Sequence, residues 1–433
     1  MKLLEFINKT PTAFHAAANV RDILLDHGYK ELYECEAWEI NKGGRYFTTR
    51  NGSSIIAFSV PENEYNGIMV CASHTDSPSL KIKSNLELPP VNGIIRLNVE
   101  GYGGMIRESW FDRPLSVAGR IAIKTGDEIE EKLINIDREL LVIPSLAIHM
   151  GKPRNDDKVN IQTELLPILR TDKAQTDFMK LIAEAANTEP ESVTGCDLCL
   201  YNREKGVVFG AENEFIASGR IDNLESVYLS LNAFLNSDGT NTLKIFAAFD
   251  NEETGSLTRQ GAESTFFSEA MERVNEALDI SRTEYMRRLA SSFILSIDNA
   301  HAGHPNYPGK ADPANSPRLN GGVVIKYNAS GRYTTDAVSA AAVKLLAERA
   351  CVPIQEYHNR SDIAGGSTLG NLMNRHISVH CADIGLAQLA MHSVYETAGA
   401  KDAQYMESLL HEFYSSEIKT EKNGKYSIIK AAR

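Results

Sequence analysis

The stretch that decides the fold is IFAAFDNEETGS, residues 245–256. Its first five residues are apolar, which is typical of a buried strand. Asp250, Glu252 and Glu253 then place three carboxylates within four positions. Removing such a group of like charges from water costs several kcal/mol for each charge unless a cation compensates. The stretch therefore predicts a buried strand that delivers acids to a cation-binding site.

Two other apolar runs end in the same way. GIMVCASHTDS, residues 67–77, ends with His74 and Asp76, and SSFILSIDNAHAG, residues 291–303, contains Asp298 near its end. Near-continuous apolar strands that alternate with helical patterns predict an α/β fold with a mostly parallel central sheet flanked by helices. Ligands of such sheets bind beyond the carboxyl ends of the strands. We therefore expect these polar side chains to meet at one edge of the sheet.

Three segments show helical patterns. DNLESVYLSLNAFL, residues 222–235, carries an apolar stripe of helical period. TTDAVSAAAVKLLAERA, residues 334–350, opens with residues that cap helices and continues in good helix formers. A third helix is predicted near the start of the chain, with Thr10 as its N-cap and Pro11 in its first turn.

Residues 86–214 have a different character, because they are β-rich with glycine-containing turns and show little helical period. A chain of 433 residues is too long for one ordinary core, so two domains are expected. We predict that residues 86–214 form a β-rich domain inserted into a discontinuous catalytic domain, residues 1–85 and 215–433. The glycine-rich GYGGM, residues 101–105, lacks the Lys-Ser/Thr pair of a P-loop, which argues against nucleotide binding.

The composition excludes several classes of function. The formal charge is −12, from 57 acidic and 45 basic residues, which argues against nucleic acid as a partner. No apolar run approaches the roughly 18 residues that a membrane helix needs, and the first residues lack a signal-peptide pattern, so we expect a cytoplasmic protein.

Cys196 and Cys199 form a CxxC pair without a second pair nearby, which favours free thiols over a zinc site.

Seven residues are candidates for chemistry. Two imidazoles with several carboxylates form a mixed nitrogen and oxygen ligand set, which suits zinc and, less selectively, manganese or cobalt. Charge counting favours two divalent ions, whose four positive charges balance three carboxylates and one bridging hydroxide. The candidates are His74, Asp76, Asp222, Glu252, Glu253, Asp298 and His392.

The two adjacent glutamates can divide the work of a metal site. If Glu253 binds a metal, Glu252 lies close to the metal-bound water without being needed as a ligand. A carboxylate in that place can take the proton of the water and pass it to a leaving amine. The metals would lower the pKa of the water and polarise the substrate carbonyl.

Each candidate also has an ordinary structural interpretation. A single His at a strand end is more often a hydrogen-bonded loop residue, but Asp76 can hold the second ring nitrogen of His74, as expected for a metal-bound imidazole. Asp222 could only cap the helix that follows it. Asp298 could cap a turn, and His392 could lie in the core on an amphipathic helix. The order of these residues on successive strand ends favours the metal site.

At this set of residues the chain resembles the aspartyl aminopeptidase family of dinuclear zinc exopeptidases. The resemblance extends over nearly the whole sequence. It rests on the motifs TPTAFHAA, SHTDSPSLKIK, IPSLAIHM, QTELLPIL, GRIDNLES, FDNEETGS, DNAHAGHPNY, VIKYN, GGSTLG and QLAMHSVYE.

The resemblance implies a role for each residue of the metal site. His74 and Asp298 resemble the ligands of one zinc ion, and Glu253 and His392 those of the other. Asp222 resembles the carboxylate that bridges the two ions. It further implies that Glu252 is the general acid/base and that Asp76 orients His74.

Two residues outside the metal site are also implied. His149, in LAIHM, is similar to the family histidine that stabilises the tetrahedral intermediate, from its own or a neighbouring subunit. Lys326, in VIKYN, resembles a residue that holds the acidic side chain of the substrate, although an exposed strand lysine is the ordinary alternative. The family also has a β-rich dimerisation domain at the predicted insertion, and its members form homo-oligomers, often dodecamers.

The sequence thus predicts a cytoplasmic metalloaminopeptidase with two divalent ions per chain, zinc before manganese or cobalt. It would remove an N-terminal Asp or Glu from peptides with a free N-terminus, through a hydroxide that bridges the metals. The first alternative is a related dinuclear hydrolase with another N-terminal or N-acyl specificity. The second is a non-catalytic shell or cargo-binding assembly.

Overall fold

A computed structural model describes residues 2–150, 159–237, 239 and 241–430. Its centre is a nine-stranded sheet in the order β1-β2-β3-β13-β4-β14-β18-β16-β17. Four neighbouring strands in the middle of the sheet, β13, β4, β14 and β18, are parallel to one another. The strands, in sheet order, are Lys30–Glu31, Arg45–Arg50, Ser54–Ser59, Thr242–Phe249, Gly67–His74, Phe293–Ile297, His380–Gly385, Val323–Tyr327 and Ile354–His358.

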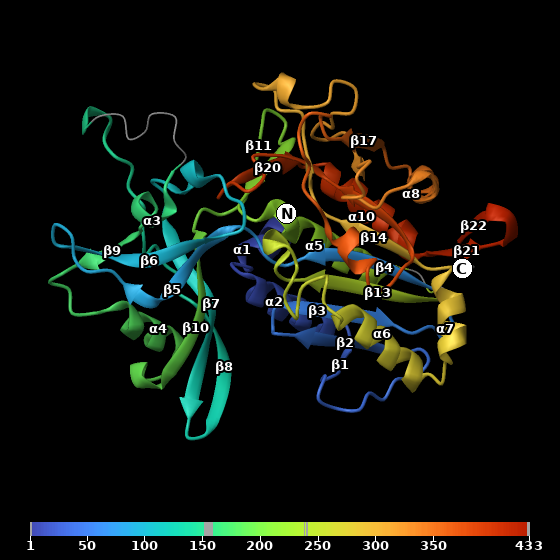
Figure 1. Ribbon diagram of the computed structural model, residues 1–433, viewed down its shortest axis with the longest axis horizontal. Coiled ribbons are helices and arrows are strands. Elements are labelled where there is room, and N and C mark those ends of the chain that lie inside the picture. The colour runs from blue at the N-terminus through green and yellow to red at the C-terminus, as the bar shows by residue number, and fades with distance from the viewer. Residues whose placement is uncertain (1, 151–158, 238, 240, 431–433) are drawn as a thin grey trace.

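Helices cover both faces of this sheet (Figure 1). Side chains alternate along β4, where Met69 and Cys71 belong to the core on one face and Ile68 and Val70 to the core on the other. The strand is continuously apolar because neither face meets water. On one face lie α1 (Lys2–Asn8), α2 (Ala13–Asp26), α5 (Ile221–Asn236), α8 (Ala337–Arg349) and α10 (Asp402–Tyr414); on the other lie α6 (Phe266–Ala277), α7 (Arg282–Leu289) and α9 (Leu369–Met373).

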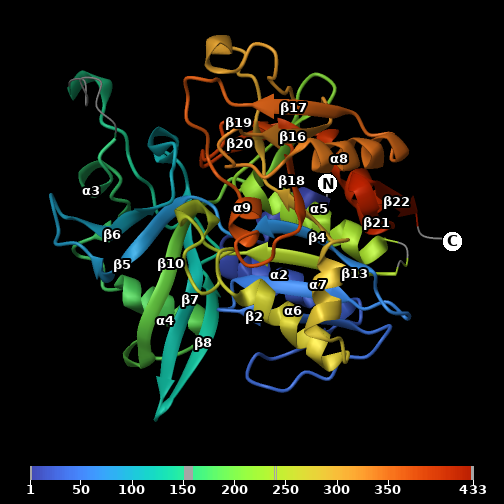
Figure 2. The ribbon, with the colours of Figure 1, turned by 45° about the vertical axis from the view of Figure 1, so that its right-hand side comes forward.

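A six-stranded sheet, called the inserted sheet below, lies beside the central sheet, at the left in Figures 1 and 2. Its order is β8-β7-β10-β5-β6-β9, and it has a separate hydrophobic core onto which α4 packs. Its strands are β5 (Ser79–Glu87), β6 (Ile94–Tyr102), β7 (Leu115–Thr125), β8 (Glu128–Asn135), β9 (Ile168–Thr171) and β10 (Val193–Asn202), with helices α3 (Ile161–Glu164) and α4 (Phe178–Ala186).

The inserted sheet begins somewhat earlier in the chain than the predicted domain limit at residue 86. Strand β5 enters the inserted sheet at Ser79, before residue 86, because the chain leaves the central sheet directly after His74. A further five-stranded sheet combines segments from distant parts of the chain, and a two-stranded hairpin follows α10. These strands are β11 (Val207–Phe209), β12 (Phe215–Ser218), β15 (Ala300–His301), β19 (Ala387–Leu389), β20 (Glu396–Gly399), β21 (Ser416–Thr420) and β22 (Tyr426–Lys430).

The predicted fold class is confirmed, and so are the helices at 222–235 and 334–350. Helix α8 begins after Asp336, whose carboxylate accepts a hydrogen bond from the Ser339 backbone N–H. The predicted start of the first long helix is wrong, because α2 begins at Ala13 with Thr12 as its N-cap residue. Thr10 instead donates its hydroxyl to the Phe6 carbonyl and so belongs to the end of α1. Among the described residues, none of the helices has both the length and the apolar character required to cross a bilayer.

Candidate metal centre

The structure brings the five predicted metal ligands together. His74 ends β4, Glu253 follows β13 and Asp298 follows β14, so three ligands come from the carboxyl ends of neighbouring parallel strands. Asp222 lies in the first turn of α5, and His392 follows β19 of the five-stranded sheet. The predicted meeting of His74, Glu253 and Asp298 at one edge of the central sheet is confirmed. Asp222 and His392 reach the same place from a helix and from another sheet, and not from successive strand ends as expected.

Asp222 lies between the two histidines. Its Oδ1 is 3.4 Å from His74 Nε2, and its Oδ2 is 3.5 Å from His392 Nε2. Asp298 Oδ1 lies 3.5 Å from His74 Nε2, and Glu253 Oε2 lies 3.4 Å from His392 Nε2. One carboxylate therefore faces two separate groups of ligand atoms, each with one imidazole and one further carboxylate.

Asp76 holds both the imidazole and the turn that carries the glutamates. Its carboxylate oxygens accept hydrogen bonds from the backbone N–H groups of Glu252, at 3.1 Å, and Glu253, at 3.2 Å. Its Oδ1 lies 3.3 Å from His74 Nδ1, which leaves Nε2 directed at Asp222. Asn251, with φ 64°, reverses the chain after β13 so that both glutamates turn back toward His74. This is the placement expected of a carboxylate that orients a metal-bound imidazole.

The cluster has strongly perturbed acidities. Burial raises the pKa of Glu252 to about 8. The negative charge of Asp298 also raises this pKa, whereas His74 lowers it. Burial, together with Asp222, raises the pKa of Glu253 well above its usual range. Burial also opposes ionisation of Asp222, but contacts with His392 and His74 outweigh it and lower its pKa. The carboxylates are thus too crowded to ionise together without added positive charge.

The residues fit divalent metal ions. Asp222 Oδ1 and Glu253 Oε1 are buried and accept no hydrogen bond within the described part of the chain. Such orphaned acceptors in a cluster of imidazoles and carboxylates are the donor set that zinc prefers. Two ligand groups with atoms mutually within 4.8 Å share Asp222: one with His74 and Asp298, the other with Glu253 and His392. His74, Glu252 and Glu253 form a third such group, which places Glu252 beside the ligands.

His149 and Lys326 lie differently from the metal ligands. His149 is exposed on the turn Ile148–Met150, at the upper left of Figure 1, and belongs to none of the ligand groups found in the described residues. Lys326 is 1% exposed, so its interpretation as an exposed strand lysine is wrong. Its ammonium donates to the Asp298 carbonyl at 2.7 Å, to Asp298 Oδ2 at 3.2 Å and to the Asn299 carbonyl at 3.3 Å.

Two residues that support the predicted ligands were not expected from the sequence. Glu396 accepts the backbone N–H groups of Asp222, at 3.1 Å, and His392, at 2.8 Å. Tyr102 donates its hydroxyl to Asp76 at 2.6 Å. A glutamate four positions after His392 and a tyrosine beside glycines carry no pattern that indicates such contacts, because both contacts form only through the tertiary fold.

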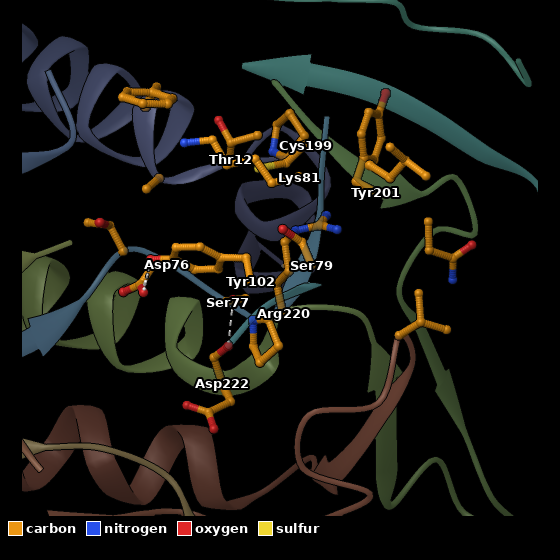
Figure 3. A pocket seen from close by; sticks show the side chains of 18 of the residues that line it. Thr12, Asp76, Ser77, Ser79, Lys81, Tyr102, Cys199, Tyr201, Arg220 and Asp222 are labelled. Carbon is orange, nitrogen blue, oxygen red and sulfur yellow. Dashed lines mark hydrogen bonds between the residues drawn. The ribbon is translucent and has the colours of Figure 1, made fainter. Parts of the chain in front are cut away.

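A cavity of about 100 Å³ adjoins the cluster, between the inserted sheet and the start of α2 (Figure 3). Asp76 and Asp222 contribute to its wall, together with Tyr102 and Arg220. In Figure 3 the Tyr102 hydroxyl points at Asp76, and Ser77 bonds the backbone of Asp222. The Asp76–Tyr102 pair thus marks the place where the inserted sheet reaches the metal ligands.

An α/β sheet that gathers imidazoles and several carboxylates beside its carboxyl edge is typical of metal-dependent hydrolases. The sequence model of the family described as Aminopeptidase I zinc metalloprotease (M18) matches residues 6–414. The chain therefore belongs to this family of zinc aminopeptidases, and the resemblance seen in the sequence motifs is confirmed.

Relatives and solved structures agree with this membership. The "Probable M18 family aminopeptidase 2" of Clostridium novyi is 43% identical over 424 residues, which are 96% of this chain and 98% of the relative. A solved structure of the Ape4 and Nbr1 complex has a chain that is 34% identical, with a TM-score of 0.91 over 95% of this chain and 84% of that one. The Saccharomyces cerevisiae mApe1 dodecamer has a TM-score of 0.84 at 26% identity, over 95% of each chain.

Proposed function

We propose that this chain is an aminopeptidase with two divalent metal ions, most suitably zinc, that removes an N-terminal Asp or Glu from peptides. The observation that carries the proposal is the position of Asp222, with one oxygen toward each of two ligand groups. His74 and Asp298 would hold one ion, Glu253 and His392 the other, and Asp222 both. When bound, the ions would lower the pKa of an attacking water and polarise the scissile carbonyl.

Glu252 would move the proton in this reaction. Its carboxylate lies next to His74 and Glu253 without being part of the two groups that share Asp222. In that place it can accept the proton of the attacking water and deliver it to the amine of the departing peptide. Asp76 would keep the Glu252 turn and the His74 ring in place through the hydrogen bonds described above.

The free N-terminus of the substrate would be bound by the acids of the cluster, which explains a requirement for a terminal amine. The proposed preference for Asp or Glu rests on Lys326, a buried cation beside Asp298. Its ammonium already donates to Asp298 and Asn299, so it would attract an acidic side chain of the first residue through its charge. An alternative is that Lys326 only orients Asp298, in which case another first residue would be preferred.

Removal of the metals should abolish the activity. We expect treatment with a chelator to lower kcat/KM by roughly 10³-fold, and added zinc, manganese or cobalt to restore it. The assay uses short peptides that vary only in the first residue, including Asp, Glu and Leu, together with an N-acylated peptide. Restoration on Asp or Glu peptides supports the full proposal. Cleavage of the acylated peptide instead would favour the related dinuclear hydrolase.

His149 is proposed to act on a neighbouring subunit of a homo-oligomer. The turn that carries it also presents Ile148 and Met150, which are 85% and 74% exposed and would gain from burial against another copy. The solved mApe1 relative is described as a dodecamer. A histidine on such a projecting turn would reach the reacting carbonyl only in the assembly.

Co-expression of two inactive variants tests this assignment. We expect His149→Ala and Glu252→Gln each to be inactive alone, and their mixed assembly to regain about a quarter of the wild-type activity if each site takes one histidine from a neighbour. Each variant co-expressed with a second copy of itself is the control. A mixed assembly without activity would place His149 in its own subunit, and a His149→Ala variant that is active alone would place it outside the reaction.

A further inference from the structure

The glycine-rich GYGGM, residues 101–105, lies against the candidate metal centre although it comes from the inserted sheet. We propose that its residues Tyr102, Gly103 and Gly104, called the glycine turn below, position the ligands of both metals. The inference rests on the proposed two-metal site and adds a positioning element from outside the central sheet. Glycines in a turn are commonly present only for backbone reversal, but this turn also contacts the predicted ligands.

Tyr102 joins the glycine turn to Asp76. Its hydroxyl donates to Asp76 Oδ2 at 2.6 Å (Figure 3). It also accepts a hydrogen bond from Asn251 Nδ2 at 2.8 Å. Asp76 in turn lies against His74 Nδ1 and holds the N–H groups of both glutamates. Tyr102 therefore fixes the residue that orients one imidazole and the turn after β13.

Gly103 and Gly104 approach the ligands of the other ion. A Cβ added to Gly103 would lie 3.0 Å from Glu253 Cβ and 3.3 Å from the Glu253 carbonyl oxygen. A Cβ added to Gly104 would lie 3.9 Å from His392 Nδ1. Two residues further on, the backbone N–H of Ile106 donates to the His392 carbonyl at 3.0 Å. The turn thus packs directly on Glu253, and the Ile106 N–H that follows it holds the loop of His392.

These contacts reach both halves of the centre from one short segment. Asp76 and His74 lie at the proposed site of one ion, and Glu253 and His392 lie at the proposed site of the other. A displacement of the inserted sheet would therefore move the supports of both ions together. Groups that support metal ligands in this way typically change metal affinity or activity by 10- to 100-fold when they are removed.

The first test removes only the Tyr102 hydroxyl. We expect Tyr102→Phe to weaken zinc binding by about 10-fold or more in a chelator competition, while the circular dichroism spectrum stays that of the wild type. Tyr201→Phe is the matched control, because the Tyr201 hydroxyl also makes a side-chain hydrogen bond, to Asn135 at 2.7 Å, but within the inserted sheet. Equal zinc affinity of the two variants and the wild type would overturn the role of Tyr102.

The second test fills the space beside Glu253. We expect Gly103→Ala to reduce the bound zinc from two ions to about one per chain, because the new methyl group displaces Glu253. Gly126→Ala is the control for backbone strain: Gly126 also has a positive φ, +62° against +72° at Gly103, but nothing lies within 4 Å of its added Cβ. The control is expected to keep both ions.

The outcomes separate this inference from the proposed function. A wild-type chain that binds fewer than two ions after zinc loading would overturn the two-metal site itself. A wild type with two ions and a Gly103→Ala variant that is folded and equally loaded would overturn only the glycine turn. Should Gly103→Ala fail to fold, the zinc affinity of Tyr102→Phe still decides the question.

Discussion

Replacing Glu252 with Gln should lower kcat by about 10³-fold while both metal ions stay bound, within the range typical of a lost general base. The amide keeps the size of the side chain but cannot accept the proton of the attacking water. The hydrogen bond from the Glu252 backbone to Asp76 is unaffected by the change, so the turn is expected to keep its shape. Steady-state kinetics and metal analysis of the same sample measure the two quantities.

Two further glutamates serve as controls for this prediction. Glu253→Gln should lose metal as well as activity, because Glu253 is assigned as a ligand beside His392. Glu276→Gln, on the exposed side of α6, should change neither. A Glu252→Gln variant with full metal content and most of its kcat would show that another group transfers the proton. Loss of metal by that variant would make Glu252 a ligand.

Much of the fold follows from patterns that are local in the sequence. The apolar runs that end at His74 and Asp298 predict parallel strands, because continuous burial occurs only where helices cover both faces. Once the strands are parallel, their carboxyl ends must share one edge, so the meeting of His74, Glu253 and Asp298 could be expected. The acids after residue 249 predict a cation for an electrostatic reason that does not depend on the fold.

The rest depends on contacts between distant segments. Nothing in the sequence around Tyr102 indicates that its hydroxyl meets Asp76, because the contact requires the inserted sheet to fold back onto the central one. From the sequence alone, Lys326 can be an ordinary exposed strand residue. In the fold its strand pairs with β18, and its ammonium donates a hydrogen bond to the Asp298 carboxylate. The start of α2 was misplaced because Thr10 can either cap the following helix or bond back to Phe6, and the packing of α1 decides between them.

Buried hydrogen bonds also fix the relative position of the two predicted ligands that come from outside the central sheet. Asp222 and His392 come from segments that are far apart in the chain, yet Glu396 accepts a backbone N–H from each. The same carboxylate accepts from Gln388 Nε2 at 3.3 Å, which ties it to the five-stranded sheet. The distance between the two ligands is therefore set by backbone hydrogen bonds as well as by their own side chains.

Replacing Asp222 with Asn should remove both metal ions, unlike the loss of any other single ligand. The neutral amide supplies one weak oxygen where two charged oxygens face His74 and His392, so each ion loses a ligand and the pair loses a negative charge. The backbone N–H that Asp222 donates to Glu396 is retained, so the local fold should persist. We expect bound zinc well under one ion per chain and activity at background.

Asp298→Asn is the matched comparison, because Asp298 contacts only the His74 side of the cluster. That variant should keep about one ion per chain, on the side of Glu253 and His392. A calorimetric titration of each metal-free variant with zinc gives the number of ions bound per chain and distinguishes the two results. If Asp222→Asn kept one tightly bound ion while Asp298→Asn lost both, the shared ligand would be Asp298. The division of the cluster into two groups around Asp222 would then be wrong.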